Sequence, residues 1–173
     1  PVPEIQRTSL APVLLLLSSL GVTHPFKFAF IDPPHTTLLC HALLALAYVG
    51  AVDRQGKLTE IGKLLALLPV PPSVGKFLLT GIFYRSKSDA LTIAAMLCVD
   101  NLYILHDDNE DRHAPRASAG YSAAAQAQHL TMASRHGDIV TLLCVYELWR
   151  VAGYSAAWAK EHYVSHAALC QAR

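Results

Sequence analysis

Residues 51–59 read AVDRQGKLT, and this stretch decides the first half of the fold. Gly56 supplies the positive φ that a tight turn needs, so residues 51–58 are predicted to form a small β-hairpin with Arg54 and Lys57 near its tip. Thr59 can cap a short helix over residues 60–68, which ends as the chain approaches a proline. The segment therefore predicts a hairpin with a basic tip, followed by a short helix.

Two helices are predicted upstream of this hairpin. Apolar residues recur at three- and four-residue steps over residues 9–20 and again up to Val49, which is the helical period. Asp32 is expected to cap the second helix, with Pro33 in its first turn, and Gly50 is expected to end it. Two helices, a hairpin and a short helix in this order fit a small winged-helix unit.

The run Pro-Val-Pro-Pro at residues 69–72 is a stiff junction and is taken as a domain boundary. Beyond it the chain reads as helical throughout, with one loop that contains an acidic cluster at residues 107–111. We expect a mainly α protein with a winged-helix domain over residues 1–70 and a helical bundle over residues 71–173. The bundle helices are predicted at residues 73–84, 88–99, 120–134, 138–152 and from Ser155 to the end, with caps at Ser88, Asp138 and Ser155.

The composition excludes several classes of protein. Of 173 residues, 53% are hydrophobic and 16% are charged, which is unlike a disordered chain. The longest unbroken apolar run, residues 42–52, is too short to cross a bilayer, so no membrane partner is expected. The net charge is +1, divided as +3 over residues 1–86 and −2 over residues 87–173, so neither half is a strongly basic nucleic-acid arm.

Motifs of nucleotide-binding loops, zinc proteases and serine hydrolases are absent, so no catalytic residue is expected in this segment. His162 and His166 lie four residues apart and would share one face of the predicted last helix. That spacing leaves a metal-dependent hydrolase as a minor alternative, but no third ligand has motif spacing, and no metal site is predicted. The cysteines lie far apart and are expected to be buried free thiols in a reducing compartment. They are Cys40, Cys98, Cys144 and Cys170.

A series of short strings resembles, in order, the region that follows the second RecA-like domain of DEAH-box helicases. The strings occur in family order over nearly the whole chain. They are PEIQRTSL at residues 3–10, FIDPP at 30–34, ALLALAYVGA at 42–51, GKLTEIG at 56–62, LPVPP at 68–72 with Lys76, IAAML at 93–97, GD at 137–138 with TLL at 141–143, VY at 145–146 with Trp149, and Trp158 with Glu161.

The resemblance implies a winged helix followed by a helical ratchet, or HA2, domain that is C-terminally truncated in this chain. Because the chain starts at Pro1, it is expected to be a piece of a longer protein. In this family the ratchet helps enclose single-stranded RNA against two RecA-like domains, which use ATP and Mg²⁺ and lie upstream of this segment. The winged helix takes part in docking glycine-patch activators in some members. Intracellular, nuclear residence follows from the same resemblance.

Several positions depart from the family pattern. Its His after Gly-Asp is Ile139 here, its Asn before Val-Tyr is Cys144, and its final Glu-Asn-Phe is Glu161-His-Tyr. A later Arg is Ala167, and the usual aromatic-Arg-Pro string is replaced by LYILH at residues 102–106. Polar groups that face RNA in relatives are therefore lost or substituted in this chain.

Eight residues are candidates for contact with RNA. Each also has an ordinary structural role: helix ends, capping and a solvated turn explain them without RNA. The tryptophans and Tyr146 recur near helical spacing and are expected to pack in the core rather than to stack on bases. The candidates are Asp100, Asn101, Asp138, Thr141, Lys160 and His162 in the bundle, and Arg54 and Lys57 at the wing tip.

Two functions from different classes remain open. The first is an accessory segment of an ATP-dependent RNA helicase, which shapes a path for the strand and hydrolyses no ATP alone. The alternative is a helical docking module that binds proteins and makes little direct contact with RNA. The exposed acidic loop and the near-neutral charge favour this alternative.

Overall fold

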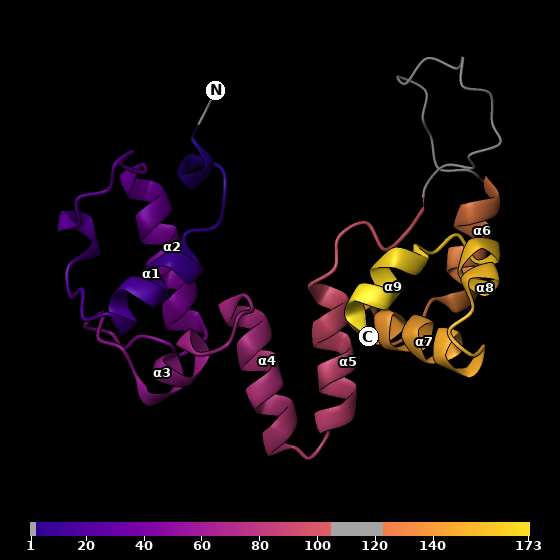
Figure 1. The fold of residues 1–173 in the computed structure, drawn as a ribbon. Helices are drawn as coiled ribbons and strands as arrows, with labels where there is room; N and C mark the ends of the chain where they lie inside the picture. The colour runs from indigo at the N-terminus through magenta and orange to yellow at the C-terminus, as the bar shows by residue number, and fades with distance from the viewer. Residues whose placement is uncertain (1–2, 105–122) are drawn as a thin grey trace. The chain divides into compact units, whose positions relative to one another are not determined.

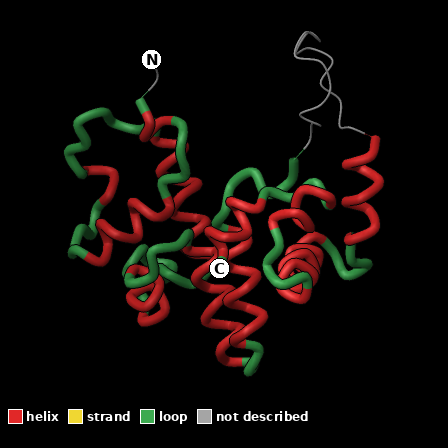
Figure 2. Tube along the Cα trace, turned by 45° about the vertical axis from the view of Figure 1, so that its right-hand side comes forward, coloured by secondary structure: helices red, strands yellow, loops and turns green. Residues whose placement is uncertain are grey.

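The computed structural model describes residues 3–104 and 123–173, and these residues are mainly helical (Figure 1). They contain no β-sheet, and their pairing of extended chain is limited to two isolated bridges (Figure 2). The chain divides into two compact units, residues 1–80 and residues 81–173. The mainly helical class is therefore confirmed. The division proposed at residues 70 and 71 stays a prediction.

The first unit packs three helices and two short 3₁₀ turns around aliphatic side chains. Helix α1 lies against both α2 and α3. The fully buried side chains of the first unit are leucine, alanine and valine, with Leu14, Leu46 and Leu65 at the centre of the cluster. The elements are η1 (Glu4–Gln6), α1 (Ala11–Ser19), η2 (Pro25–Lys27), α2 (Thr36–Tyr48), α3 (Glu60–Ala66) and α4 (Pro72–Phe83), which extends into the second unit.

Helix α2 begins three residues later than an N-cap at Asp32 would place it. Its N-cap is His35, whose ring Nδ1 accepts the Thr37 N–H at 3.4 Å. The prediction that Asp32 caps the helix is wrong, because a residue followed by proline avoids the helical region, and Pro33 and Pro34 keep this entry extended. The stop at Gly50 is confirmed by its φ of +76°.

The β-hairpin at residues 51–58 is not confirmed. The segment is a tight turn closed by one antiparallel bridge between Val52 and Leu58. The Asp53 carboxylate accepts the backbone N–H groups of Gln55 and Lys57 at 2.8 and 2.9 Å, and Gly56 has the expected positive φ of +80°. Strands cannot extend further because α3 begins immediately afterwards, capped by Thr59 as predicted.

The second unit is built around α7, which packs against α5 and α6, while α9 packs against α5 and α8. Trp149 on α7 is completely buried at its centre, and Tyr146 and Trp158 pack against the same cluster. The prediction that these aromatic residues belong to the core is confirmed. The helices are α5 (Lys87–Leu97), α6 (Ala123–Met132), α7 (Asp138–Val151), α8 (Ala156–Glu161) and α9 (His166–Ala172).

The predicted last helix is interrupted, and this is a correction. Ser155 caps α8 as expected, but α8 ends at Glu161, and Tyr163 takes a left-handed φ of +54°. The chain then forms one antiparallel bridge between Val164 and Tyr103, and a new helix starts with Ser165 as its cap. Histidines 162 and 166 consequently do not share one helix face.

Two further caps differ from the prediction. Helix α5 begins at Lys87 after Ser86, so Ser88 lies inside its first turn and does not cap it. Helix α7 begins at Asp138 itself, and the N-cap is Gly137, whose φ of +102° suits only glycine. A residue inside the first turn contributes through its charge near the helix N-terminus rather than through capping.

The prediction of buried cysteines is also wrong. Cys40, Cys98 and Cys170 are exposed and Cys144 is half-buried, and all four are free thiols. Each lies on a helix or at its end, beside rather than on the core-facing stripe; in α2, for example, Leu39 and Ala42 are buried on either side of Cys40. The acidic cluster at residues 107–111 lies outside the described residues.

Candidate functional site

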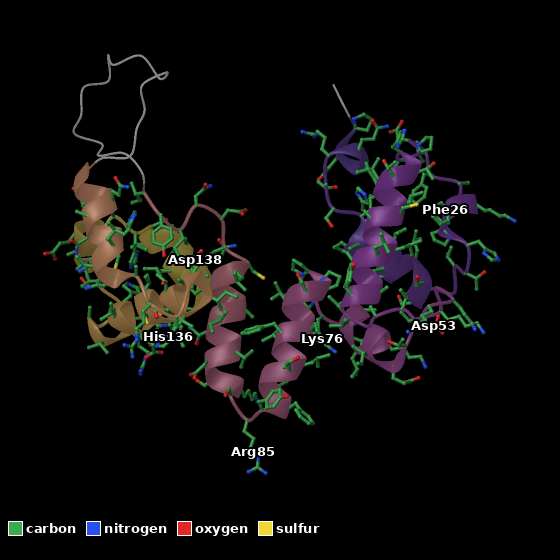
Figure 3. The ribbon with its side chains drawn as sticks, turned by 180° about the vertical axis from the view of Figure 1, so that it is seen from behind. Phe26, Asp53, Lys76, Arg85, His136 and Asp138 are labelled. Carbon is green, nitrogen blue, oxygen red and sulfur yellow. The ribbon has the colours of Figure 1, made fainter. Side chains whose placement is uncertain are left out.

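An open apolar groove of about 580 Å³ lies within the first unit. Phe26 comes from η2 and Asp53 from the turn after α2, and both are labelled in Figure 3. Part of its apolar lining is exposed: Leu44 keeps 56% of its surface accessible and Phe26 keeps 52%. The groove is lined by Phe26, Cys40, Leu43, Leu44, Ala47, Val52, Asp53, Arg54 and Gly56.

The two predicted wing-tip residues lie in the turn beside this groove. Arg54 and Lys57 are both exposed, and Arg54 belongs to the groove lining. The Asp53 carboxylate is already bonded to two backbone N–H groups of the turn, so it fixes the turn rather than either cation. The turn thus presents two cations next to an apolar surface.

At the start of α7 the structure separates the roles of Asp138 and Thr141. Asp138 is exposed in the first turn, whereas the Thr141 side chain is buried. The Thr141 hydroxyl donates to the Gly137 carbonyl at 3.1 Å and accepts the Ser134 N–H at 2.9 Å. Both of its hydrogen-bonding functions are therefore used inside the protein, and Thr141 fixes the α6–α7 connection.

Asp100 and Asn101 follow α5 and are both exposed. Asn101 has a left-handed φ of +52°, a conformation that asparagine tolerates better than most residues. It turns the chain so that the Leu102 carbonyl accepts the Ser165 N–H and the Ile104 N–H reaches the Tyr163 carbonyl, each at 2.8 Å. The chain after Asn101 is thereby held beside the α8–α9 connection.

Lys160 and His162 end helix α8 in different environments. Lys160 is exposed, whereas His162 is half-buried and stacked on Trp158, with ring centroids 4.1 Å apart and an angle of 19° between the planes. The His162 Nδ1 lies 2.8 Å from the Trp158 carbonyl oxygen, so this nitrogen carries the proton and donates it. One face of the His162 ring and its Nδ1 are therefore used inside the protein.

Tyr103 and His129 form a junction that the sequence analysis missed. Their ring centroids are 4.6 Å apart, and the His129 Nε2 donates to the Tyr163 carbonyl at 3.0 Å. Burial raises the pKa of the Tyr103 phenol, and the negative charge of Asp138 raises it further. The junction brings together the chain after Asn101, helix α6 and the α8–α9 connection, and no periodic pattern in the sequence indicates it.

The candidate residues therefore lie in both units: Arg54 and Lys57 in the wing turn of the first unit, and the other six in the second unit, after α5, in the first turn of α7 and at the end of α8. Within the described residues no three His, Cys, Asp or Glu side chains gather closely enough to hold a metal ion. A search of the same residues finds no helix with the length and apolarity needed to span a membrane. The groove can bind apolar side chains, and the exposed cations can bind anionic groups.

Two family models match adjoining parts of the chain and together cover more than half of it. Residues 42–70 match the model described as "Helicase associated domain (HA2), winged-helix". Residues 71–142 match the model described as "Helicase associated domain (HA2), ratchet-like". The two matches follow each other without a gap, in the same order as the winged helix and the bundle expected from the sequence.

Proposed function

Because the chain belongs to the helicase-associated (HA2) region found at the C-terminal end of DEAH-box helicases, we propose that it is an accessory segment of an ATP-dependent RNA helicase. In this role it helps to enclose single-stranded RNA, while RecA-like domains outside the segment move the strand and remodel ribonucleoprotein. The continuous match of residues 42–142 to the winged-helix and ratchet-like models carries this proposal.

The residues of this chain do not fit an ATP site. The sequence has no phosphate-binding loop of the type G-x-x-x-x-G-K-[ST], so ATP and Mg²⁺ belong to the RecA-like domains of the longer protein. The contribution of this segment is a surface for RNA. The exposed cations Arg54, Lys57 and Lys160 support it best, while the exposed Asp100, Asn101 and Asp138 can accept hydrogen bonds from base edges.

Thr141 and His162 support RNA contact less well. The Thr141 hydroxyl already makes two internal hydrogen bonds, and one face of the His162 ring is covered by Trp158. We propose that both residues position the surface that Asp138 and Lys160 present. Lys160 attracts a phosphate, whereas the Asp138 carboxylate in the first turn of α7 repels one.

The test compares this chain with the longer protein that contains the RecA-like domains. We expect no ATP hydrolysis by the 173-residue chain, weak binding to a fluorescein-labelled oligouridine, and RNA-stimulated ATP hydrolysis by the longer protein. Ultraviolet crosslinking to 4-thiouridine RNA should mark peptides of residues 81–173. The proposal would be overturned if RNA did not stimulate ATP hydrolysis by the longer protein, or if no crosslinked peptide came from this segment.

The groove favours a second candidate function, docking of a protein partner. Its lining is mostly apolar, with Asp53 and Arg54 at the turn side, and exposed apolar surface of this kind is typical of interaction sites. We propose a glycine-patch activator as its partner, bound through apolar side chains. This function and RNA enclosure are compatible, because the groove lies in the first unit and six of the eight candidate residues lie in the second.

Two substitutions on α2 test the groove. Leu44→Glu places a charge in the groove lining, whereas Tyr48→Glu places the same charge one turn later, outside the lining. Both side chains are exposed, at 56% and 89%, so neither change should unfold the unit. We expect Leu44→Glu to abolish capture of a glycine-patch protein and Tyr48→Glu to leave it intact. Equal capture by both variants would exclude the groove.

We also propose that the protein resides in the nucleus, where DEAH-box helicases that process RNA act. A fluorescent fusion of the longer protein, imaged together with a nuclear stain, tests this. Exclusion of the fusion from the nucleus would contradict it.

A further inference from the structure

The corner between α4 and α5 exposes a group of large apolar side chains. Ile82, Phe83 and Tyr84 keep 55%, 78% and 71% of their surfaces accessible. The Phe83 and Tyr84 rings contact each other edge to face, with centroids 5.1 Å apart and an angle of 88° between the planes. In this arrangement only one edge and one face are used in the pair, and the remaining ring faces stay open to a ligand.

The backbone of this corner is closed tightly. The Ser86 N–H reaches the Gly81 carbonyl at 2.9 Å, and the Arg85 N–H reaches the Ile82 carbonyl at 3.2 Å, a Schellman ending of the helix. A Cβ on Gly81 would lie 2.3 Å from the Ala90 Cβ, so the two helices approach closely here. The corner is therefore a firmly held support for the side chains it exposes.

Arg85 occupies the position of this ending that glycine usually takes. Its φ is +61°, a strained conformation for a side chain as large as arginine. Residues held in such sparsely populated conformations cluster at functional sites. Figure 3 shows the Arg85 side chain pointing outward from the corner, away from both helices.

The chemistry around the two rings is basic and polar. Arg85 and Lys87 are exposed, and neither forms an ion pair in the part of the chain that the structure describes. Hydroxyl groups of Ser86 and Ser88 flank them, and Asp89 is the one carboxylate in residues 80–91. The corner thus carries a net positive charge beside two open aromatic rings.

We propose that the α4–α5 corner is a stacking platform for single-stranded nucleic acid. An unpaired base stacks on Tyr84 or Phe83, and Arg85 and Lys87 neutralise the adjoining phosphates. Aromatic rings with neighbouring cations are the combination that binds single strands without reading their sequence. A protein partner is less favoured, because the polar residues on the α5 side of the rings offer little further apolar surface to bury. This proposal rests on the proposed RNA function.

The test measures binding of a fluorescein-labelled oligouridine to the whole chain by fluorescence anisotropy at several salt concentrations. Tyr84→Leu removes a ring face but keeps an apolar side chain, and the Kd should rise about tenfold with an unchanged salt dependence.

Arg85→Gly removes one cation and also relieves the strained φ, so the fold is retained. The Kd should rise, and the slope of log K against log salt should become shallower by about 0.7, as for one lost phosphate contact.

Arg7→Ala is the matched control, since Arg7 is exposed in the first unit and pairs with no aromatic ring among the residues that the structure describes. It should change the Kd far less than Arg85→Gly. If wild type binds RNA and both corner variants match it, the platform is wrong while the proposed RNA function survives. If wild type and the longer protein do not bind the oligouridine, the proposed function fails as well. Loss of a protein partner by the corner variants, with RNA binding unchanged, would assign the corner to protein docking and overturn the proposal.

Discussion

The cores of the two units are built from different kinds of side chain. The fully buried side chains of the first unit are aliphatic, and the packing of leucines from α1, α2 and α3 holds it together. The second unit instead centres on a completely buried tryptophan, whose indole Nε1 donates to the Ser155 carbonyl at 3.2 Å. An apolar core tolerates replacement of one apolar side chain by another of similar shape, whereas a hydrogen-bonded junction depends on the particular donor and acceptor atoms.

The largest effect is expected from Trp149→Ala in the second unit. Removing a fully buried aromatic side chain leaves a cavity and loses its transfer free energy, which together cost about 3–5 kcal/mol. Hydrogen exchange should show lost protection in residues 123–173 and retained protection in residues 3–80. Trp158→Ala, at a half-buried position, is the control and should cost less. Equal loss of protection in both units would contradict independent cores.

Gly62→Ala should be the most damaging small change in the first unit. The added Cβ would lie 2.0 Å from the Ala51 carbonyl oxygen, a backbone atom that cannot move aside. Overpacking of this kind costs about 3 kcal/mol, measurable by chemical denaturation. In Gly75→Ala the added Cβ meets a terminal methyl group of Leu65 at 2.8 Å, a side-chain contact that can give way more easily than the backbone, so this variant should cost less. An equal cost for the two variants would show that the Ala51 contact is not decisive.

Thr141→Val tests the hydrogen-bonded junction of the second unit. The variant keeps the shape but leaves the Ser134 N–H without its acceptor, which should cost about 2 kcal/mol of unfolding free energy. Thr80→Val is the control, because the Thr80 hydroxyl is exposed and bonds only within its own helix. If Thr141→Val lowers the unfolding free energy no more than the control does, the hydrogen bond from Ser134 to Thr141 does not stabilise the unit.

The smallest effect concerns pH. The folded state raises the pKa of Tyr103 above its ordinary value of 10.0, through burial and the charge of Asp138. Above pH 10 the unfolded chain therefore releases this proton first, binds fewer protons than the folded chain, and stability falls as the pH rises. Asp138→Asn should lower the Tyr103 pKa, measured from the ultraviolet spectrum of ionising tyrosine. Tyr103→Phe identifies its signal among the seven tyrosines, and an unchanged titration in Asp138→Asn would contradict the coupling.

Features that depend on local chain chemistry could be predicted from the sequence. Helical periodicity and the stop at Gly50 are local properties, and Gly50 has the expected positive φ. Thr59 and Ser155 cap their helices for the same reason. The order of the two units could be predicted from the family resemblance, because the matching sequence strings are spread over nearly the whole chain.

Features that depend on distant contacts could not be predicted. The interruption at Tyr163 exists because residues 102–104 pair with residues 163–165, which lie far away in the sequence. The Tyr103–His129 junction has the same origin. The corner at Arg85 was missed for another reason, because an arginine gives no local signal of a left-handed φ. Six of the eight candidate contacts are exposed, but the burial and bonding of Thr141 and His162 could not be read from residue type.

The aliphatic cluster of the first unit draws its buried members from residues 10–65, whereas the cluster of the second joins Met96 to Leu169. During synthesis the ribosome can release a finished first unit while the second is still being translated, since domains fold as units from the N-terminus. The second unit must wait for α9, and until then its unpacked aromatic side chains are available to chaperones.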